Sequence, residues 1–191
     1  MPARTTLPGN PPSRVTVRLV RGPADLRDAT AMLREYREWL VTHREVTAFD
    51  DSILKVGADD FDREIDALPG AYRPPRGALF LVRDGSDAIG CGALRPQGRN
   101  VAEVKRLYLR SSYRGRGLGR RIARTVLRRA RQLGYERVVL DTLPTMTAAI
   151  ELYRSMGFRP IRAYWQHPVP GALFFGLSLR ARPGRPRKAS R

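Results

Sequence analysis

The sequence predicts a single α/β domain with a mixed, mostly antiparallel central sheet flanked by helices. Its 191 residues are 42% hydrophobic and 28% charged, which suffices for one sizeable core and excludes disorder along the whole length. Short apolar runs alternate with amphipathic segments, and antiparallel strands precede a strand–helix–strand–helix unit. We expect the domain to span residues 15–180, with an unstructured proline-rich segment at 1–14 and an unstructured basic tail at 181–191.

The N-terminal segment predicts one strand and two helical regions. Val15–Val20 has the composition of a strand. Apolar residues then recur at spacings of three and four, which is typical of a helix with one buried face: Leu26, Ala29, Leu33, Tyr36 and Leu40. The next helical or loop region ends at Leu68-Pro69-Gly70 and is crowded with acidic residues: Asp50, Asp51, Asp59, Asp60, Asp62, Glu64 and Asp66.

The central segment predicts three strands. Ala78–Arg83 and Ala88–Leu94 flank Asp84-Gly85-Ser86-Asp87, a tight-turn sequence, so these two strands should pair as a hairpin. Cys91, in the second of them, is expected to be a buried small apolar residue. Val101–Leu109 is the third strand.

The C-terminal segment predicts helices that alternate with strands. A glycine-rich turn leads into a helix over residues 117–133, which Gly134 is suited to end. The strand Arg137–Asp141 and the helix Thr145–Met156 follow, and two further strands are expected near Phe158–Trp165 and Leu173–Leu179.

Composition and charge exclude several functions. The net charge is +18, and all but three of the 36 basic residues are arginine. This balance is equally expected of an arginine-decorated surface and of a protein that attracts phosphates, acidic small molecules or nucleic acid. One cysteine excludes an intramolecular disulfide, and His43 and His167 lack metal-ligand spacing, so we expect no metal. No apolar run approaches the ~18 residues of a membrane span, and the N-terminus lacks a signal peptide's apolar stretch, which predicts a cytoplasmic protein without membrane contact.

The most informative segment runs from Leu107 to Gly119, where a predicted strand enters a glycine-rich turn that opens a helix. Glycines let successive backbone N–H groups converge, and the helix start adds free donors and partial positive charge. This combination suits a phosphate or pyrophosphate. The segment is not a P-loop, because no Gly-Lys-Ser/Thr follows. It is not a dinucleotide fingerprint either, because Arg120 occupies the third glycine position.

Two motifs together resemble the GNAT superfamily of acyl-CoA-dependent N-acetyltransferases. That family's Arg/Gln-x-x-Gly-x-Gly/Ala turn, which binds the pyrophosphate of coenzyme A, is matched by Arg114, Gly117 and Gly119. Its later Ala-x-x-x-Tyr helix before Gly-Phe is matched by Ala149, Tyr153, Gly157 and Phe158. The resemblance is specific over Ala78–Leu179 and weaker over Val15–Gly77. The proline and asparagine that the family often has are replaced by Ser111 and Met146.

The resemblance implies direct transfer of an acetyl group, in a ternary complex, from acetyl-CoA to a primary amine of a small molecule. It places the coenzyme against Leu107, Tyr108, Leu109, Arg114, Gly115, Arg116, Gly117, Leu118, Gly119 and Arg120. The strand before the turn is expected to splay from its parallel neighbour. A backbone N–H near Leu109 would then polarise the thioester carbonyl.

The resemblance also implies two catalytic residues. Tyr153 would donate the proton to the departing thiolate, because a phenol of pKa about 10 can protonate a thiolate of parent pKa about 8.5 at close range. Glu103 would act as the general base, directly or through water. An equally weighted alternative is that Glu103 only pairs with an arginine such as Arg106.

The acceptor and the oligomeric state stay open, and a homodimer is compatible with the family. The acidic residues at 50–66 suit a cationic amine, whereas Arg73, Arg76 and Arg106 suit an acceptor that bears a carboxylate or another acidic group. The two tryptophans are interpreted as core or rim residues: Trp39 and Trp165.

Two other functions compete with catalysis. The tail tripeptide Gly184-Arg185-Pro186, with basic neighbours, resembles the AT-hook core that lies in narrow minor grooves, which would make the chain a nucleic-acid-binding protein. A GNAT module that binds acyl-CoA without catalysis is the other alternative. We favour the enzyme because Tyr153 and the glycine-rich turn are both intact, and we expect no nucleic-acid partner.

Overall fold

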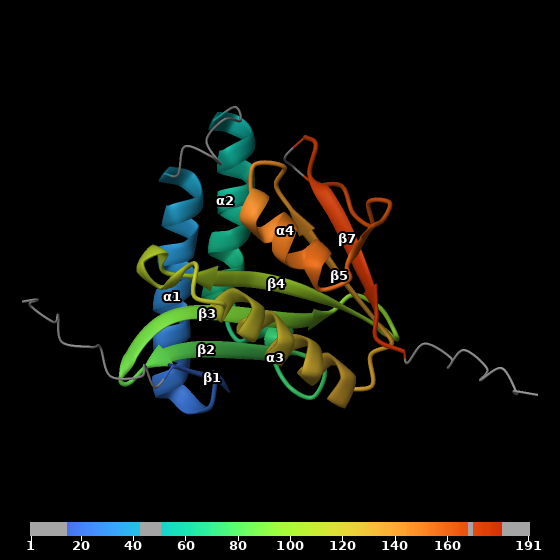
Figure 1. Ribbon diagram of the computed structural model, residues 1–191. Helices are drawn as coiled ribbons and strands as arrows, with labels where there is room; N and C mark the ends of the chain where they lie inside the picture. The colour runs from blue at the N-terminus through green and yellow to red at the C-terminus, as the bar shows by residue number, and fades with distance from the viewer. Residues whose placement is uncertain (1–14, 43–50, 168–169, 181–191) are drawn as a thin grey trace, which may run out of the picture.

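The computed structural model describes residues 15–42, 51–167 and 170–180, with the backbone alone for 51–58. The segments expected at 1–14 and 181–191, like His43 and Asp50, lie outside the described residues. The described residues form one sheet and helices on both of its faces (Figure 1).

The strands are numbered in chain order and lie in the sheet in the order β1-β2-β3-β4-β5-β7-β6. Their bounds are β1 Val15–Leu19, β2 Ala78–Asp84, β3 Asp87–Pro96, β4 Val101–Leu109, β5 Arg137–Thr142, β6 Arg159–Pro160 and β7 Leu173–Ser178. The helices are α1 Gly22–Thr42, α2 Asp51–Asp66, α3 Leu118–Gln132 and α4 Thr147–Ser155, with 3₁₀ turns at Gly70–Tyr72 and Ser111–Tyr113.

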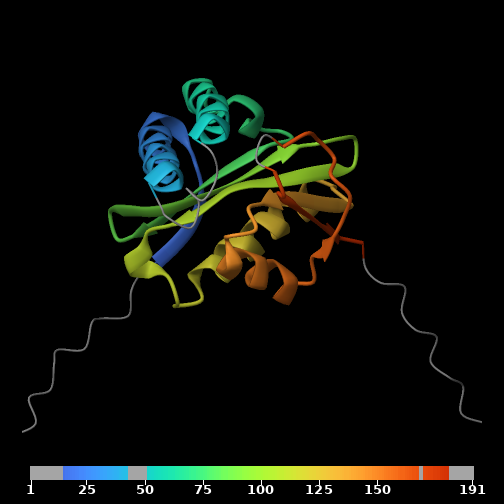
Figure 2. The ribbon, with the colours of Figure 1, turned by 90° about the horizontal axis from the view of Figure 1, so that it is seen from above.

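The two faces of the sheet carry separate hydrophobic clusters. Helices α1 and α2 cover one face, and α3 and α4 cover the other, as Figure 2 shows from above. Successive strand residues alternate between the two clusters, as the strand geometry requires. On β4, for example, Tyr108 packs on the α1 side and Leu109 on the α3 side. The mixed, mostly antiparallel sheet flanked by helices is confirmed.

The sheet opens between its two parallel strands. Strands β4 and β5 pair at only three rungs, the last of which joins Glu103 to Val139. Beyond that rung β4 continues to Leu109 beside β3, and β5 continues to Thr142 beside β7. The predicted splay, a gap between β4 and β5, is therefore present, and it leaves the backbone edge of β4 unpaired with β5 from Val104 onward.

A β-bulge lies in the splayed part of β4. Cys91 pairs with Tyr108 and Ala93 pairs with Lys105, so the two residues Arg106 and Leu107 lie opposite a single residue of β3. Arg106 adopts a φ of 58°, which is rare for a residue with a side chain. A bulge re-aims side chains, because it interrupts the alternation of faces. Lys105 and Arg106, although consecutive, consequently line the same pocket.

The region after α4 differs from its prediction. The strand expected near Phe158–Trp165 is limited to Arg159–Pro160. Pro160 has no N–H for the ladder, and after Ile161 donates its N–H to Phe174 O (2.9 Å) the chain leaves the sheet. The other predicted strands and helices are confirmed to within about two residues at their ends, as is the burial of Cys91.

Candidate active site

The glycine-rich turn presents a series of backbone N–H groups. Gly115 and Gly117 both adopt a φ of 75°, and a Cβ atom at either position would meet no atom within 4 Å. The first helical hydrogen bond of α3 runs from the Arg121 N–H to Gly117 O (3.2 Å). The preceding N–H groups of the first helical turn therefore have no backbone acceptor within the described chain. The open space and these free donors suit a diphosphate.

The arginines of the turn are held by their neighbours. Arg114 donates from Nε to Leu109 O (2.9 Å), and its guanidinium lies 4.6 Å from the centre of the Trp39 ring. Arg120 donates to Ser155 Oγ (2.7 Å) and so joins α3 to α4. The side chain of Arg114 thus braces the end of β4.

At the end of β4, the backbone N–H and C=O of one residue, Leu109, point into the gap between β4 and β5. Arg110 donates its N–H to Ile89 O of β3 (3.0 Å). Peptide groups along a strand alternate in direction, so those of Leu109 point away from β3. The hydroxyl of Tyr108 instead donates to Glu35 Oε1 (2.9 Å) on α1, so its side chain lies on the opposite side of the sheet from α3. Leu107 packs against the core on the α3 side.

Tyr153 lies on α4, a helix that contacts the glycine-rich turn through Leu152 and Ser155. A Cβ at Gly119 would be 3.5 Å from Cδ2 of Leu152, the residue before Tyr153. The Tyr153 side chain is 8% exposed, and its ring centre is 5.7 Å from that of Phe158. Burial raises the pKa of this phenol above its usual 10, so the hydroxyl stays protonated at neutral pH and can donate.

Glu103 is fully buried at the last rung before the splay. Arg95 donates from Nε to Oε2 (2.5 Å), and the Tyr164 hydroxyl donates to Oε1 (2.7 Å). Lys105 Nζ lies 3.7 Å from Oε1. The predicted pairing of Glu103 with an arginine is therefore present. The arginine is Arg95 rather than Arg106, because Arg106 binds another carboxylate.

That carboxylate belongs to Glu64 on α2. Arg106 donates to it from Nε (2.7 Å) and from Nη2 (2.9 Å), and the Tyr72 hydroxyl donates to the same group (2.6 Å). The Arg106 guanidinium also lies 3.5 Å from the centre of the Phe61 ring. Burial opposes ionisation of Glu64, but Arg106 outweighs it and lowers the pKa of this carboxyl.

A third ion pair crosses the splay. Lys105 Nζ donates to Asp141 Oδ1 of β5 (3.1 Å), and His167 Nε2 lies 3.4 Å from Asp141 Oδ2. The Tyr164 hydroxyl reaches the same carboxylate (3.3 Å) and so links it to Glu103. Burial raises the pKa of Asp141, but the hydrogen bond with His167 and the charge of Lys105 outweigh it and lower this pKa well below its usual range.

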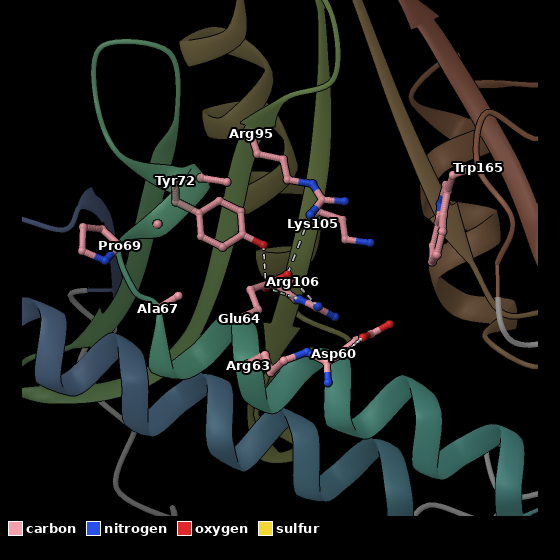
Figure 3. A pocket seen from close by; sticks show the side chains of 12 residues that line it. Asp60, Arg63, Glu64, Ala67, Pro69, Tyr72, Arg95, Lys105, Arg106 and Trp165 are labelled. Carbon is pink, nitrogen blue, oxygen red and sulfur yellow. Dashed lines mark hydrogen bonds and ion pairs between the residues drawn. The ribbon is translucent and has the colours of Figure 1, made fainter.

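A cavity of about 450 Å³ lies against these groups on the α2 side of the sheet (Figure 3). Its walls come from α2, the 3₁₀ turn at Gly70–Tyr72, strands β3 and β4, and Trp165 of the segment between β6 and β7. Lys105 reaches across toward Trp165, with Nζ 5.5 Å from the ring centre. Of the three candidate acceptor-binding arginines, only Arg106 lines this cavity. Arg73 is exposed outside its lining, and Arg76 donates to Gly98 O (2.6 Å) and lies elsewhere.

Sequence reasoning missed several of these side chains: Arg95, Lys105, Asp141, Tyr164 and His167. One local signal was available, because Glu103 and Lys105 are two residues apart on a predicted strand and must share a face. Nothing in the sequence indicated their partners. Among the described residues, no group of three or more side chains is arranged to hold a metal ion, and no helix is long and apolar enough to cross a membrane.

Comparison with known proteins identifies the family. The model of the acetyltransferase (GNAT) family matches residues 29–158. The chain belongs to this family, whose members are acyl-CoA N-acyltransferases. An uncharacterized N-acetyltransferase of Schizosaccharomyces pombe is 32% identical over 170 residues, which cover 88% of this chain and 97% of that protein. An uncharacterized N-acetyltransferase of Escherichia coli is 29% identical over 121 residues, which cover 62% and 72%.

Solved structures show the same fold. A GNAT-family acetyltransferase from Staphylococcus aureus superposes with a TM-score of 0.68 at 14% identity, covering 87% of this chain and 99% of that one. An N-acetyltransferase from Thermoplasma acidophilum in complex with coenzyme A superposes with a TM-score of 0.66 at 14% identity, covering 86% and 98%. At such low identity these structures establish the fold alone.

Proposed function

We propose that this acyl-CoA N-acyltransferase transfers an acetyl group from acetyl-CoA to the primary amine of a small molecule, directly, within a ternary complex. The observation that carries the proposal is the position of the glycine-rich turn. Its free N–H groups lie at the start of α3, which contacts α4, the helix that carries Tyr153, and they follow the part of β4 that β5 leaves unpaired. Anion-binding donors thus adjoin an unpaired strand edge and the helix of a protonated phenol.

The coenzyme is proposed to lie along β4 and the turn. The N–H groups of Gly115 to Arg120 would bind the diphosphate, and the Leu109 edge of β4 would face the pantetheine. Arg114 supports this arrangement through its bond to Leu109 O, and Arg116 adds positive charge at the turn. A fully formed cradle costs no reorganisation on binding.

Acetyl transfer needs a neutral amine, a polarised carbonyl and a proton for the leaving thiolate. The N–H of Leu109 points toward the splay, where it can stabilise negative charge that develops on the carbonyl oxygen. Tyr153 can supply the proton, and the proton that the attacking nitrogen loses restores the phenol, so that amine and thioester become amide and thiol. The same burial that raises the pKa of Tyr153 would also raise that of a thiol formed beside it, so the phenol stays a competent donor.

Glu103 is proposed as a positioning residue, while its role as general base stays a prediction. Its carboxylate has no solvent exposure and is engaged by Arg95 and Tyr164. An acceptor amine would therefore have to reach it through a water relay. By holding Arg95, which lines the cavity, Glu103 instead shapes the wall where the acceptor is expected.

The test is calorimetry with coenzyme A, followed by thiol release from acetyl-CoA across a panel of small-molecule amines. The proposal expects heat of binding and amine-dependent thiol release that Tyr153→Phe strongly reduces. Absence of coenzyme A binding would refute the proposed reaction. Binding without thiol release for any amine would favour a non-catalytic acyl-CoA-binding module.

A further inference from the structure

The cavity beside β4 is lined by cations whose partner carboxylates are already engaged. Four basic residues line it: Arg63, Arg95, Lys105 and Arg106. Two of the balancing carboxylates, Glu103 and Asp141, are absent from the lining and lie behind it, with side-chain exposures of 0% and 11%. The basic side chains therefore face the cavity, whereas two of the carboxylates that balance their charge are buried behind its wall.

The buried carboxylate that lines the cavity has little accepting capacity left. Glu64 accepts two hydrogen bonds from Arg106 and one from Tyr72. The other carboxylate, that of Asp60, is paired with Arg63 on α2, and its side chain is 54% exposed to solvent. A cationic amine would therefore find few acceptors in the buried part of the cavity.

Donors, by contrast, are left over. Arg95 uses Nε for Glu103, and its Nη1 is 3.9 Å from Glu64, too far for a hydrogen bond. Lys105 carries three N–H donors and makes one hydrogen bond, to Asp141, within the described chain. The indole Nε1 of Trp165 is buried and has no acceptor among the described residues. A buried donor without an acceptor is destabilising, so a ligand that supplies an acceptor is favoured.

From this excess of donors we propose that the acceptor is an amine that also bears a carboxylate, and that the cavity binds this carboxylate through Lys105, Arg95 and Trp165. The inference rests on the proposed N-acetyl transfer and narrows its substrate class. Tyr72 and Trp165 supply aromatic surface for the rest of the molecule (Figure 3). Lys105 belongs to the splayed part of β4, so the bound carboxylate keeps the acceptor on the strand that faces the thioester.

The first test compares thiol release for matched amines. Each of several amino acids is paired with its amide and with its decarboxylated amine, for example leucine, leucinamide and 3-methylbutylamine. We expect kcat/KM to be at least about tenfold higher for the carboxylate form, because its removal leaves buried donors unpaired. Equal or faster turnover of the amide or the simple amine would overturn the carboxylate inference while leaving N-acetyl transfer intact.

The second test does not depend on turnover. The chain has two tryptophans, so in a Trp39→Phe variant Trp165 is the sole indole and reports directly on the cavity. With saturating coenzyme A, N-acetyl-leucine should change the Trp165 emission saturably, and N-acetyl-leucinamide should not. No change with the acid, or the same change with both compounds, would overturn the inference even if no amine is acetylated.

Two variants test whether residues of the cavity wall cause the preference for the carboxylate form of the acceptor. Trp165→Phe removes the N–H but keeps an aromatic ring, and it should reduce the preference for the carboxylate about tenfold. Lys105→Met should reduce it further. Arg73→Met is the control, because Arg73 is an exposed cation outside the cavity lining, and the preference should persist. An unchanged preference in Trp165→Phe and Lys105→Met would overturn the assignment.

Discussion

Lys105 and Asp141 form an ion pair across the gap between β4 and β5, with Nζ 3.1 Å from Oδ1. The last backbone rung between these strands joins Glu103 to Val139, two residues earlier on each strand. Side chains therefore connect the two strands where backbone pairing has ended. The pair bridges the gap between the two strands on the α2 side, where the cavity lies.

Replacement of Asp141 by asparagine should destabilise the fold by about 2 kcal/mol at pH 7, because it leaves Lys105 and its surroundings with an unbalanced charge. The pKa of Asp141 is lowered in the folded state. Its contribution is therefore present above the unfolded-state pKa of about 3.9 and is lost as the pH falls toward the lower folded-state pKa. The difference in unfolding free energy between the parent and Asp141→Asn should be constant from pH 7 to about pH 5 and shrink below about pH 4, as measured by denaturant unfolding.

The matched control is Asp66→Asn. Asp66 lies 3.9 Å from Arg34, and both side chains are largely exposed, so its loss should cost at most about 0.5 kcal/mol. A pH-independent difference for Asp141→Asn would show that its carboxylate does not carry the proposed stabilisation.

Tyr153→Phe should lower kcat about 10²–10⁴-fold, because a positioned general acid contributes about that much. Affinity for acetyl-CoA should stay within about twofold, since only a hydroxyl is removed. The control is Tyr135→Phe, which deletes another buried hydroxyl, one bonded to Arg76 O (2.8 Å) far from the turn. This variant should lose stability and keep its kcat. Steady-state kinetics measure kcat, and calorimetry measures the affinity for acetyl-CoA. An unchanged kcat in Tyr153→Phe would remove the phenol from the mechanism.

Gly117→Ala should weaken coenzyme A binding by tenfold or more. The new Cβ would occupy the open space at the turn and strain a residue whose φ is 75°. Gly134→Ala is the control, because Gly134 has a φ of 80° and a similarly open surrounding at the other end of α3. It should cost comparable stability without changing coenzyme affinity.

Gly119→Ala should be nearly neutral for folding, because its Cβ would make an ordinary 3.5 Å contact with Leu152. For the three alanine variants, calorimetric titration measures the affinity for coenzyme A and thermal unfolding measures the stability. Comparing the two separates an effect of backbone strain from a lost contact with the coenzyme. Equal coenzyme affinity in Gly117→Ala and Gly134→Ala would contradict a diphosphate site at the turn.

Glu103→Gln distinguishes a positioning role from proton abstraction. The amide can still accept from Tyr164 but leaves Arg95 without a balancing charge, so we expect a loss of about 2 kcal/mol in stability. We expect the acidic limb of the pH–rate profile to persist with a lower plateau. Loss of that limb would instead establish Glu103 as the general base. Glu136→Gln, which breaks an exposed ion pair with Arg180, controls for the change of charge.

Local sequence patterns predicted most of the fold, because each depends on residues close together in the chain. The three- and four-residue spacing of apolar side chains predicted α1 and α3, and the Asp84–Asp87 turn predicted the hairpin. The prediction of a strand near Phe158–Trp165 is wrong beyond Pro160, because the chain leaves the sheet after the Ile161 hydrogen bond. Tyr164 instead bonds to the ion-pair network, and Trp165 lines the cavity.

The sequence by itself determined the glycine-rich turn, the strand that precedes it and the position of Tyr153 one helix later. Only the tertiary structure decided which of the many arginines bind which carboxylates. Arg106 meets Glu64, which is 42 residues away, and Lys105 meets Asp141, which is 36 residues away. The physical reason is that charge pairing depends on distance in space and on burial. The bulge in β4 and the end of β4–β5 pairing determine the distances between these charges and their burial. Neither feature leaves a periodic signal in the chain.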